Sequence, residues 1–365
     1  MALDGYDTLV VKIGSALLVE DRRLRSAWLD TLARDVAEFR NGGTKVVIVS
    51  SGAIALGCNA LGLPRQSLSL AQKQACAAVG QSLLTRAYDD ALQRYGLRAA
   101  QALLTLGDTE DRRRYLNARA TLETLLDLGV VPVVNENDTV ATAEIRYGDN
   151  DRLAARAAQM VGADALVLLS DINGLYTADP RADADAEHIP VVDALTDAHT
   201  AMAGEANAGA GVGTGGMATK LLAVRIATAA GCDMIICDGR EAGALARLAG
   251  GARHTLFRAK AEPKAARAQW IAGSLAPAGT LIVDAGAARA LATGRSLLAA
   301  GITAAEGAFS KGDTVRVVGP DGDTLALGLS AYDARDLQAV CGLRSEQIEH
   351  PTGPVVVHRD NLVMQ

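Results

Sequence analysis

Aromatic residues, cysteines and long apolar runs are scarce in this chain of 365 residues. Aromatics make up only 3%, so the core must be built from Ala, Val, Leu and Ile. The five cysteines are odd in number and include no Cys-x-x-Cys pair, which argues against a disulfide framework and a zinc ribbon. No apolar run reaches the length of a membrane span, and the five histidines form no HExxH motif.

Positive charge is also in deficit. The chain has 36 Lys and Arg against 42 Asp and Glu, a net charge of −6, and its one basic run, Arg112–Arg114, follows two acidic residues. General nucleic-acid binding through a basic surface is therefore not expected. The N-terminus leads straight into a predicted strand, so we expect no signal peptide, no membrane partner and a cytoplasmic location. With 49% hydrophobic and 21% charged residues, disorder over most of the chain is excluded.

Short β-branched runs alternate with Ala- and Leu-rich helical stretches through the first two-thirds of the chain. The runs predicted as strands are Thr8–Ile13, Lys45–Ser50, Leu97–Leu104, Val130–Val134, Ala165–Leu169 and Met234–Cys237. The stretches predicted as helices are Trp28–Asn41, Ser69–Tyr95, Arg113–Leu128, Asp149–Val161 and Met217–Ala230. Strands that are apolar throughout and separated by helices are typical of a parallel sheet covered on both faces. We therefore predict an α/β/α sandwich with a mainly parallel sheet over residues 1–258.

The composition changes after residue 255. Residues 259–278 are rich in Ala, Lys and Pro, which indicates a linker. Short strands and Gly-rich turns then follow closely; the predicted strands are Thr280–Asp284, Thr314–Val318, Leu325–Leu329 and Val355–His358. This pattern is typical of a small β-barrel, so we predict a second domain over residues 279–365.

The chemically suggestive residues fall where the predicted strands end, the edge at which parallel α/β sheets bind ligands. Lys12 lies in the first apolar strand, where its ammonium is costly to bury unless it meets an anion. Gly14 would let a phosphate approach backbone N–H groups. A lysine that reaches solvent is the alternative. Ser51 and Gly52 precede a helix and indicate either an anion site or an ordinary Ser-capped turn.

Two polar clusters follow the predicted strand Val130–Val134. Asn135–Asp138 comes directly after the strand, and Gly148–Asp151 opens the next helix. Acidic residues suit a helix start, so capping explains either cluster alone, but two in one strand–loop–helix unit favour a polar ligand site. Residues 170–181 form a long irregular loop at another strand end, suited to nucleotide contacts or to a surface turn.

The segment Gly211–Lys220 is a glycine-rich stretch that precedes a helix. Gly211, Gly213 and Gly216 match GxGxxG, but nothing resembling a strand precedes them, which argues against a Rossmann site. Lys220 lies too far from Gly216 for a Walker A loop. The remaining interpretation is a flexible loop whose backbone N–H groups bind phosphates, with Lys220 reaching over from the first helical turn.

The inventory of these residues favours phosphoryl transfer. It contains two lysines, Gly-rich anion loops and acidic residues between them, and it lacks a Ser–His–Asp pattern and a metal-ligand cluster. Phosphoryl transfer depends mostly on positioning and on positive charge at the moving group. Two lysines held by a carboxylate fit that need.

The motifs KIGS, SSGAIALG, NEND, GDND, SDINGLYTADPR and GTGGMATK, in this order, resemble the amino acid kinase family over nearly the whole chain. NENDTVATAEI followed by GDND narrows the resemblance to the branch that acts on glutamate, and the C-terminal domain resembles a PUA module. The resemblance implies Mg²⁺-dependent transfer of phosphate from ATP to the side-chain carboxylate of L-glutamate, giving L-glutamyl 5-phosphate and ADP. This reaction is the first step of proline biosynthesis. Feedback inhibition by proline and a homo-oligomer are also implied.

The resemblance assigns roles to individual residues. Lys12 and Lys220 would be catalytic charges on the transferred group, oriented by Asp151, and no residue is assigned to the metal. The residues implied at ATP are Lys12, Gly14, Ser170, Asp171, Thr214, Gly215, Gly216, Met217, Ala218, Thr219 and Lys220. The residues implied at glutamate are Ser51, Asp138 and Asn150. The glutamate carboxylate is already ionised at neutral pH, so no general base is required.

Two other functions stay open at this point. One is a related kinase that acts on another small acid. The other is an RNA-binding protein, because PUA modules commonly bind RNA. From residue 276 to the C-terminus the chain has seven Lys and Arg against ten Asp and Glu, which speaks against an RNA-binding surface.

Overall fold

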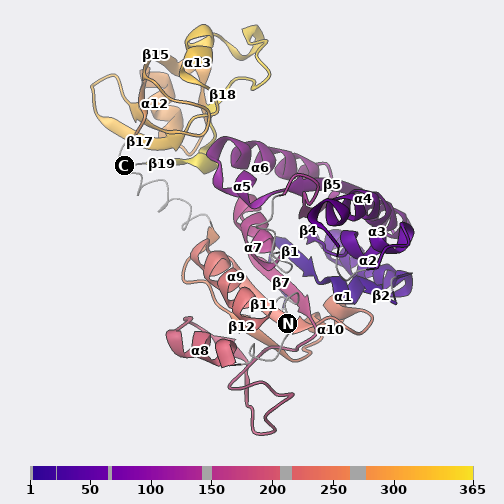
Figure 1. The fold of residues 1–365 in the computed structure, drawn as a ribbon. Coiled ribbons are helices and arrows are strands. Elements are labelled where there is room, and N and C mark those ends of the chain that lie inside the picture. Colours follow the sequence, from indigo (N-terminus) through magenta and orange to yellow (C-terminus); the bar gives the residue numbers. More distant parts are fainter. Residues whose placement is uncertain are drawn as a thin grey trace. The chain divides into compact units, whose positions relative to one another are not determined.

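The apolar runs of the first two-thirds of the chain form one eight-stranded sheet (Figure 1). The computed structural model describes residues 3–21, 23–64, 68–141, 150–205, 216–263 and 277–364. The strands of this sheet follow the order β10-β12-β11-β7-β1-β4-β6-β5. Their bounds are β1 (Thr8–Ile13), β4 (Lys45–Val49), β5 (Ala99–Leu104), β6 (Val131–Glu136), β7 (Ala165–Ser170), β10 (Val191–Val192), β11 (Asp233–Asp238) and β12 (His254–Phe257).

The sheet is mainly parallel, as predicted. Of the neighbouring pairs of strands in this sheet, only β11 and β12 are antiparallel, and every other pair is parallel. β10 and β12 were not predicted. Along β12 the side chains alternate between half-buried and buried, which is typical of a strand near the edge of a sheet rather than of its apolar centre.

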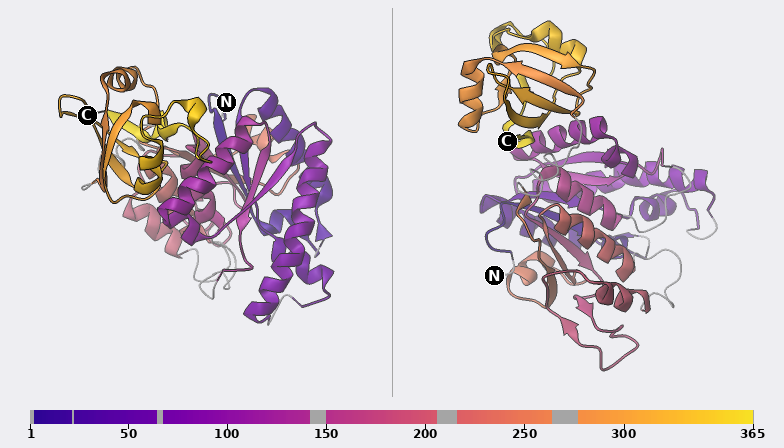
Figure 2. Two further views of the ribbon diagram at one scale, coloured as in Figure 1. Left: turned by 90° about the horizontal axis from the view of Figure 1, so that it is seen from above. Right: turned by 90° about the vertical axis from the view of Figure 1, so that its left-hand side faces the viewer.

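Helices cover both faces of the sheet (Figure 2). On one face, β1, β4, β6, β7 and β11 share a hydrophobic core cluster with three helices: α2 (Ser26–Asn41), α4 (Leu70–Gln93) and α10 (Ala244–Ala249). On the other face, two helices that pack on each other also pack on the strands: α7 (Asn150–Val161) and α9 (Met217–Ala229). The α/β/α layering is thus confirmed.

The other helices and strands that the structure describes up to residue 263 complete this part of the chain. They are α1 (Ser15–Leu18), β2 (Val19–Glu20), β3 (Arg23–Leu24), α3 (Ala53–Ala60), α5 (Leu106–Glu110), α6 (Arg112–Asp127), β8 (Leu175–Tyr176), β9 (His188–Ile189) and α8 (Asp197–Glu205). Of these, α3 packs extensively against α4.

The chain divides into two compact units. The first contains the large sheet and ends at Pro263. The second comprises Asp111–Asn117 and the described part of Lys264–Gln365. Within the predicted linker, residues 264–276 lie outside the described residues.

The second unit is rich in β-structure around its own core. A five-stranded sheet has the order β15-β13-β16-β17-β19, and β14 pairs with β18. The bounds are β13 (Gly279–Val283), β14 (Leu297–Leu298), β15 (Ile302–Gly307), β16 (Thr314–Val318), β17 (Thr324–Leu329), β18 (Val355–Val357), β19 (Leu362–Met364), α12 (Ala285–Ala292), α13 (Ala334–Val340) and three 3₁₀ turns, Ala299–Gly301, Ser345–Gln347 and Arg359–Asn361. All four strands predicted for this region are present, and Phe309 and Tyr332 are the large side chains of its core.

No helix in the described part of the chain combines the length and the apolar character that a membrane crossing requires. All five cysteines are free thiols, four of them buried.

Candidate active site

The carboxyl ends of β1, β4, β6, β7 and β11 lie along one edge of the sheet, because these strands are parallel. β1 and β7 are neighbours, yet the chain leaves β1 toward β4 and leaves β7 toward β11, on opposite sides. Parallel sheets form a crevice where neighbouring strands diverge in this way. The polar clusters found in the sequence are therefore gathered at the expected binding edge.

Lys12 is buried near the end of β1 and is 9% exposed. Val11 and Ile13 on either side of it face the core cluster on the α2 and α4 face. Side chains alternate along a strand, so the Lys12 side chain points to the face that α7 covers. Gly14 follows directly, and a Cβ added there would lie 4.0 Å from Lys12 Nζ. The absence of a side chain at Gly14 keeps the space beside this ammonium open.

Asp151 lies between the two predicted lysines. Its Oδ1 is 2.6 Å from Lys12 Nζ, and its Oδ2 is 3.3 Å from Lys220 Nζ. Asp151 is fully buried, and Lys220 is 6% exposed. The structure thus brings together residues from β1, the first turn of α7 and the first turn of α9.

The two ammonium groups decide the charge state of Asp151. Burial alone would raise the pKa of this carboxyl, but the attraction and hydrogen bonds of Lys12 and Lys220 outweigh it and lower the pKa below its usual value. Asp151 also stands in the first turn of α7, where the helix dipole favours negative charge. Asp151 is therefore an anion at neutral pH.

The glycine-rich segment reaches this cluster through the start of α9. Gly216 is the N-cap of the helix, and Met217, Ala218 and Thr219 form its first turn with Lys220. Thr219 Oγ1 donates to the Gly216 carbonyl at 2.8 Å and lies 3.3 Å from Asp151 Oδ2. Two further predicted nucleotide residues, Thr214 and Gly215, lie outside the described residues.

The amide nitrogen of Asn150, next to Asp151, has three acceptors within hydrogen-bond distance, which share its two N–H groups. Asn150 Nδ2 donates to the Ser50 carbonyl at 2.7 Å, to Ser51 Oγ at 2.7 Å and to Asn135 Oδ1 at 3.1 Å. Ser51 and Asn150, predicted to bind the same ligand, are thus in direct contact. Because the amide nitrogen is occupied, Asn150 can offer a ligand its Oδ1, which is an acceptor.

Asp138 lies two residues beyond the end of β6, in a turn. Burial raises the pKa of its carboxyl to about 6. Its charge therefore changes close to neutral pH, whereas Asp151 stays ionised. Among the described residues no hydrogen bond or ion pair joins Asp138 to Ser51 or Asn150.

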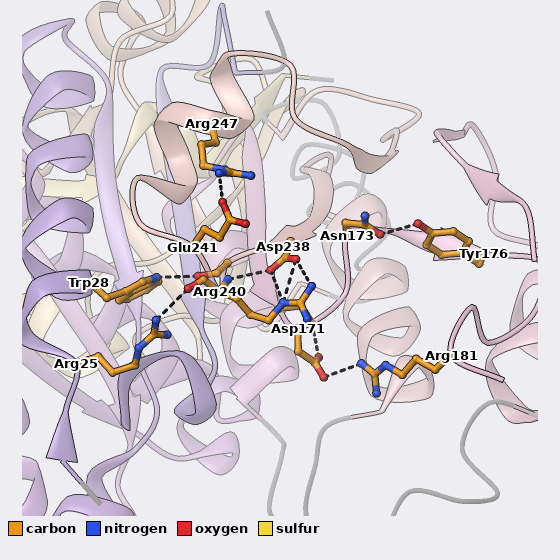
Figure 3. Close-up of polar contacts among 12 residues, drawn as sticks. Arg25, Trp28, Asp171, Asn173, Tyr176, Arg181, Asp238, Arg240, Glu241 and Arg247 are labelled. Atoms are coloured by element: carbon orange, nitrogen blue, oxygen red, sulfur yellow. Dashed lines mark hydrogen bonds and ion pairs between the residues drawn. The ribbon is translucent and has the colours of Figure 1, made fainter. Parts of the chain in front are cut away.

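Ser170 is the last residue of β7, on the other side of β1, and Asp171 follows it. Ser170 Oγ donates to Asp171 Oδ1 at 3.2 Å, and Arg181 Nη2 donates to Asp171 Oδ2 at 2.8 Å (Figure 3). Partial burial would raise the pKa of Asp171, but Arg181 and the hydrogen bonds lower it. Arg181 closes the loop of residues 171–181 onto the strand end.

The next strand end, after β11, is anchored to α2 and the turn before it. Trp28 Nε1 donates to the Gly239 carbonyl at 2.8 Å, and Arg25 Nη2 donates to the Arg240 carbonyl at 3.1 Å. The Arg240 side chain in turn binds the Asp238 carboxylate, as Figure 3 shows. The backbone of the turn Gly239–Arg240 is therefore held in place. This turn lies beside the loop that carries Asp171 (Figure 3).

Sequence reasoning singled out Asn135 only as a member of the cluster Asn135–Asp138, without a role of its own, and it missed Gln81. Asn135 is 2% exposed at the end of β6, and its Nδ2 donates to Gln81 Oε1 at 2.7 Å. An asparagine that ends an apolar strand was a usable signal, and it stood in a cluster that the sequence did single out. Gln81 gave none, since a glutamine inside a long helix is ordinary.

No group of three or more His, Cys, Asp and Glu side chains that could hold a metal ion exists among the described residues. Mg²⁺ does not require such a group, because it is usually bound by substrate phosphates with one or two carboxylates. The donor set is thus compatible with a magnesium ion that arrives on a nucleotide.

Comparison with known proteins agrees with this geometry. Residues 7–238 match the amino acid kinase family, and residues 279–352 match the PUA domain. A protein named glutamate 5-kinase from Caulobacter vibrioides is 56% identical over 368 residues, covering 100% of this chain and 98% of the relative. Another, from Paramagnetospirillum magneticum, is 56% identical over 363 residues, covering 98% of this chain and 97% of the relative.

A solved structure shares the fold of the first unit. Carbamate kinase from Giardia lamblia, bound to AMP-PNP, superimposes with a TM-score of 0.50 at 17% identity, over 71% of this chain and 99% of that chain. At this identity the similarity is one of fold.

Proposed function

This chain belongs to the amino acid kinase family and, within it, to the glutamate 5-kinases, and on that premise we propose how its residues carry out the reaction. The enzyme is a phosphotransferase of the first step of proline biosynthesis. It transfers the γ-phosphoryl group of ATP to the side-chain carboxylate of L-glutamate. The observation that carries the mechanism is the convergence of Lys12 and Lys220 on Asp151.

Lys12 and Lys220 stabilise the phosphoryl group during transfer. Their ammonium groups come from β1 and α9 and meet at one carboxylate, so a group bound beside Asp151 faces both. Negative charge spreads over the phosphoryl oxygens in the transition state, and fixed positive charges in a buried site stabilise it strongly. Gly14 and the start of α9 at Gly216 supply backbone N–H groups for the phosphates.

Asp151 acts on the lysines and not on the phosphate. It fixes the position of both ammonium groups before ATP arrives, so little rearrangement is needed during transfer. As an anion it is a poor neighbour for phosphate, and its two oxygens are directed at the lysines.

Ser51, Asn150 and Asp138 bind the amino-acid end of glutamate. Asn150 Oδ1 and the Asp138 carboxylate are acceptors, which suits the three N–H groups of an α-ammonium. The side-chain carboxylate of glutamate is then the nucleophile. It is ionised at neutral pH, so the residues need only orient it toward the γ-phosphorus.

Ser170 and Asp171 border the nucleotide at the end of β7. Mg²⁺, bound to the ATP phosphates, would neutralise part of their charge. We also propose a cytoplasmic enzyme, a homo-oligomer and feedback inhibition by proline, all three supported by the family resemblance and the first by the five free thiols.

The test is a coupled ADP-release assay with glutamate, aspartate, N-acetylglutamate, carbamate and UMP. Glutamate is expected to give the highest kcat/KM by a wide margin. A higher kcat/KM for one of the other four compounds would show that this compound, and not glutamate, is the substrate. The proposed roles of the lysines in phosphoryl transfer would still stand.

A further inference from the structure

We infer that Gln81 and Thr85 of α4 help the Ser50 carbonyl to hold the Asn150 amide in one orientation, and so strengthen the binding of glutamate. This inference rests on the proposed function, because it concerns the proposed glutamate pocket. Neither residue was implied by the family resemblance. Both act through other side chains, so they are positioning residues.

A chain of hydrogen bonds leads from α4 to Asn150. Gln81 Oε1 accepts from Asn135 Nδ2 at 2.7 Å, and Asn135 Oδ1 accepts from Asn150 Nδ2 at 3.1 Å. Gln81 is 8% exposed and Asn135 is 2% exposed. In so buried a chain each amide needs its partner, because an unsatisfied polar group costs more than the bond is worth.

Both ends of this chain are fixed by backbone carbonyls, which can only accept. At one end Thr85 Oγ1 donates to the Gln81 carbonyl at 2.9 Å, so the hydroxyl must accept from Gln81 Nε2, 3.3 Å away. At the other end Asn150 Nδ2 donates to the Ser50 carbonyl at 2.7 Å. A side-chain amide can be turned over in place, but here every amide is directed by its neighbour.

The orientation of the Asn150 amide decides whether its oxygen or its nitrogen faces the ligand. With Nδ2 directed at Ser50 and Asn135, Asn150 presents Oδ1 to a ligand, as an acceptor for an α-ammonium. If the Asn150 amide turned over, it would present N–H groups to a cation. Gln81 and Thr85 oppose this rotation of the amide through Asn135, although neither residue is among those proposed to bind glutamate.

The experiment compares matched substitutions on α4. Gln81→Met keeps the length of the side chain and removes both amide groups, and Thr85→Val keeps the shape and removes the hydroxyl. Each is expected to raise the KM for glutamate about fivefold, since one hydrogen bond contributes about 1 kcal/mol, while the KM for ATP and kcat change less than twofold. Thr85→Ser keeps the hydroxyl and should restore the KM for glutamate.

Gln93→Met is the control, because Gln93 is an exposed glutamine at the far end of the same helix. It should leave all three constants unchanged. An unchanged KM for glutamate in Gln81→Met and Thr85→Val would overturn the inference. A lower kcat together with a higher KM for both substrates and a lower melting temperature would also overturn it, because that is the pattern of a purely structural role.

Failure of the proposed function is seen separately, in the unmodified enzyme. If that enzyme prefers another substrate, glutamate is the wrong ligand. The same variants then test the hydrogen-bond chain with the preferred substrate.

Discussion

Asp151 shares one negative charge between two buried ammonium groups, so these three side chains carry a net charge of +1. A fully neutralised cluster would attract phosphate less, and unpaired lysines would be costly to bury. One carboxylate for two lysines meets both requirements. The arrangement also implies that the lysines act together in the transition state.

Replacing either lysine with alanine should lower kcat by about 100- to 1000-fold, the usual effect of removing one preorganised charge or donor. Lys12→Ala and Lys220→Ala are to be compared with Lys45→Ala, an exposed lysine that pairs with Asp127 at the other end of the sheet. Steady-state kinetics measures the effect. Near-normal kcat with only a raised KM for ATP would assign the lysine to ground-state binding.

Asp138 should make glutamate use dependent on pH. The pKa of this carboxyl is raised to about 6 by burial, so its charge is present above that pH and is lost below it. Because kcat/KM reports groups of the unbound enzyme, kcat/KM for glutamate should fall about tenfold per pH unit below pH 6.

Asp138→Asn is the control for that profile. It should have a raised KM for glutamate and lack this fall, which separates Asp138 from the ATP phosphate that titrates in the same range. A profile that is the same in both proteins would remove Asp138 from the pocket.

The close packing of α3 against α4 determines how near Gln81 lies to Asn135 at the end of β6. A Cβ added at Gly80 would lie 1.7 Å from the Ala53 carbonyl, and one added at Gly57 would lie 1.7 Å from the Cys76 carbonyl. The two helices therefore touch backbone to backbone. This contact places Gln81, the residue after Gly80, beside the end of β6.

Gly80→Ala should destabilise the protein by about 3 kcal/mol or more, because the helices must move apart to admit the methyl group. Chemical denaturation measures the change. Gly107→Ala in α5 is the control, since the nearest atom to its added Cβ is 3.6 Å away. It should be neutral or slightly stabilising. Equal stability of both variants would mean that the crossing adjusts without cost.

The sequence predicted the central elements closely and the peripheral ones poorly. The strand Thr8–Ile13 has the predicted bounds, and α4 begins after Ser69, whose side chain forms a capping box with Gln72. Both carry strong local signals. β10 is only two residues long, and β12 has a half-buried pattern, so neither forms the apolar run by which a central strand is recognised.

For the site, the sequence indicated which residues matter but not which of them touch. Lys12, Asp151 and Lys220 were predicted together, and the structure joins them. Gln81 could not be predicted, because its role depends on the backbone contact at Gly80 and on the place of Asn135 in the sheet. Contacts of that kind follow from packing between distant segments, which no local pattern records.

Residues 1–260 should form an active kinase without the second unit. All predicted catalytic and binding residues precede residue 255, and a chain of this length can bury a large core. A truncation after Lys260 is expected to fold, as judged by circular dichroism, and to release ADP in the presence of glutamate. A folded truncation that binds ATP but does not turn over would place a required catalytic element in the PUA domain.

Lys12 and Lys220 lie near opposite ends of the first unit in sequence, and this has a consequence for the nascent enzyme. β1 leaves the ribosome early, but α9 follows only after most of the unit has been made. Until then Asp151 has one lysine and the phosphoryl group would meet one charge. A chain that still lacks α9 therefore lacks one of the two charges on which the proposed transfer depends.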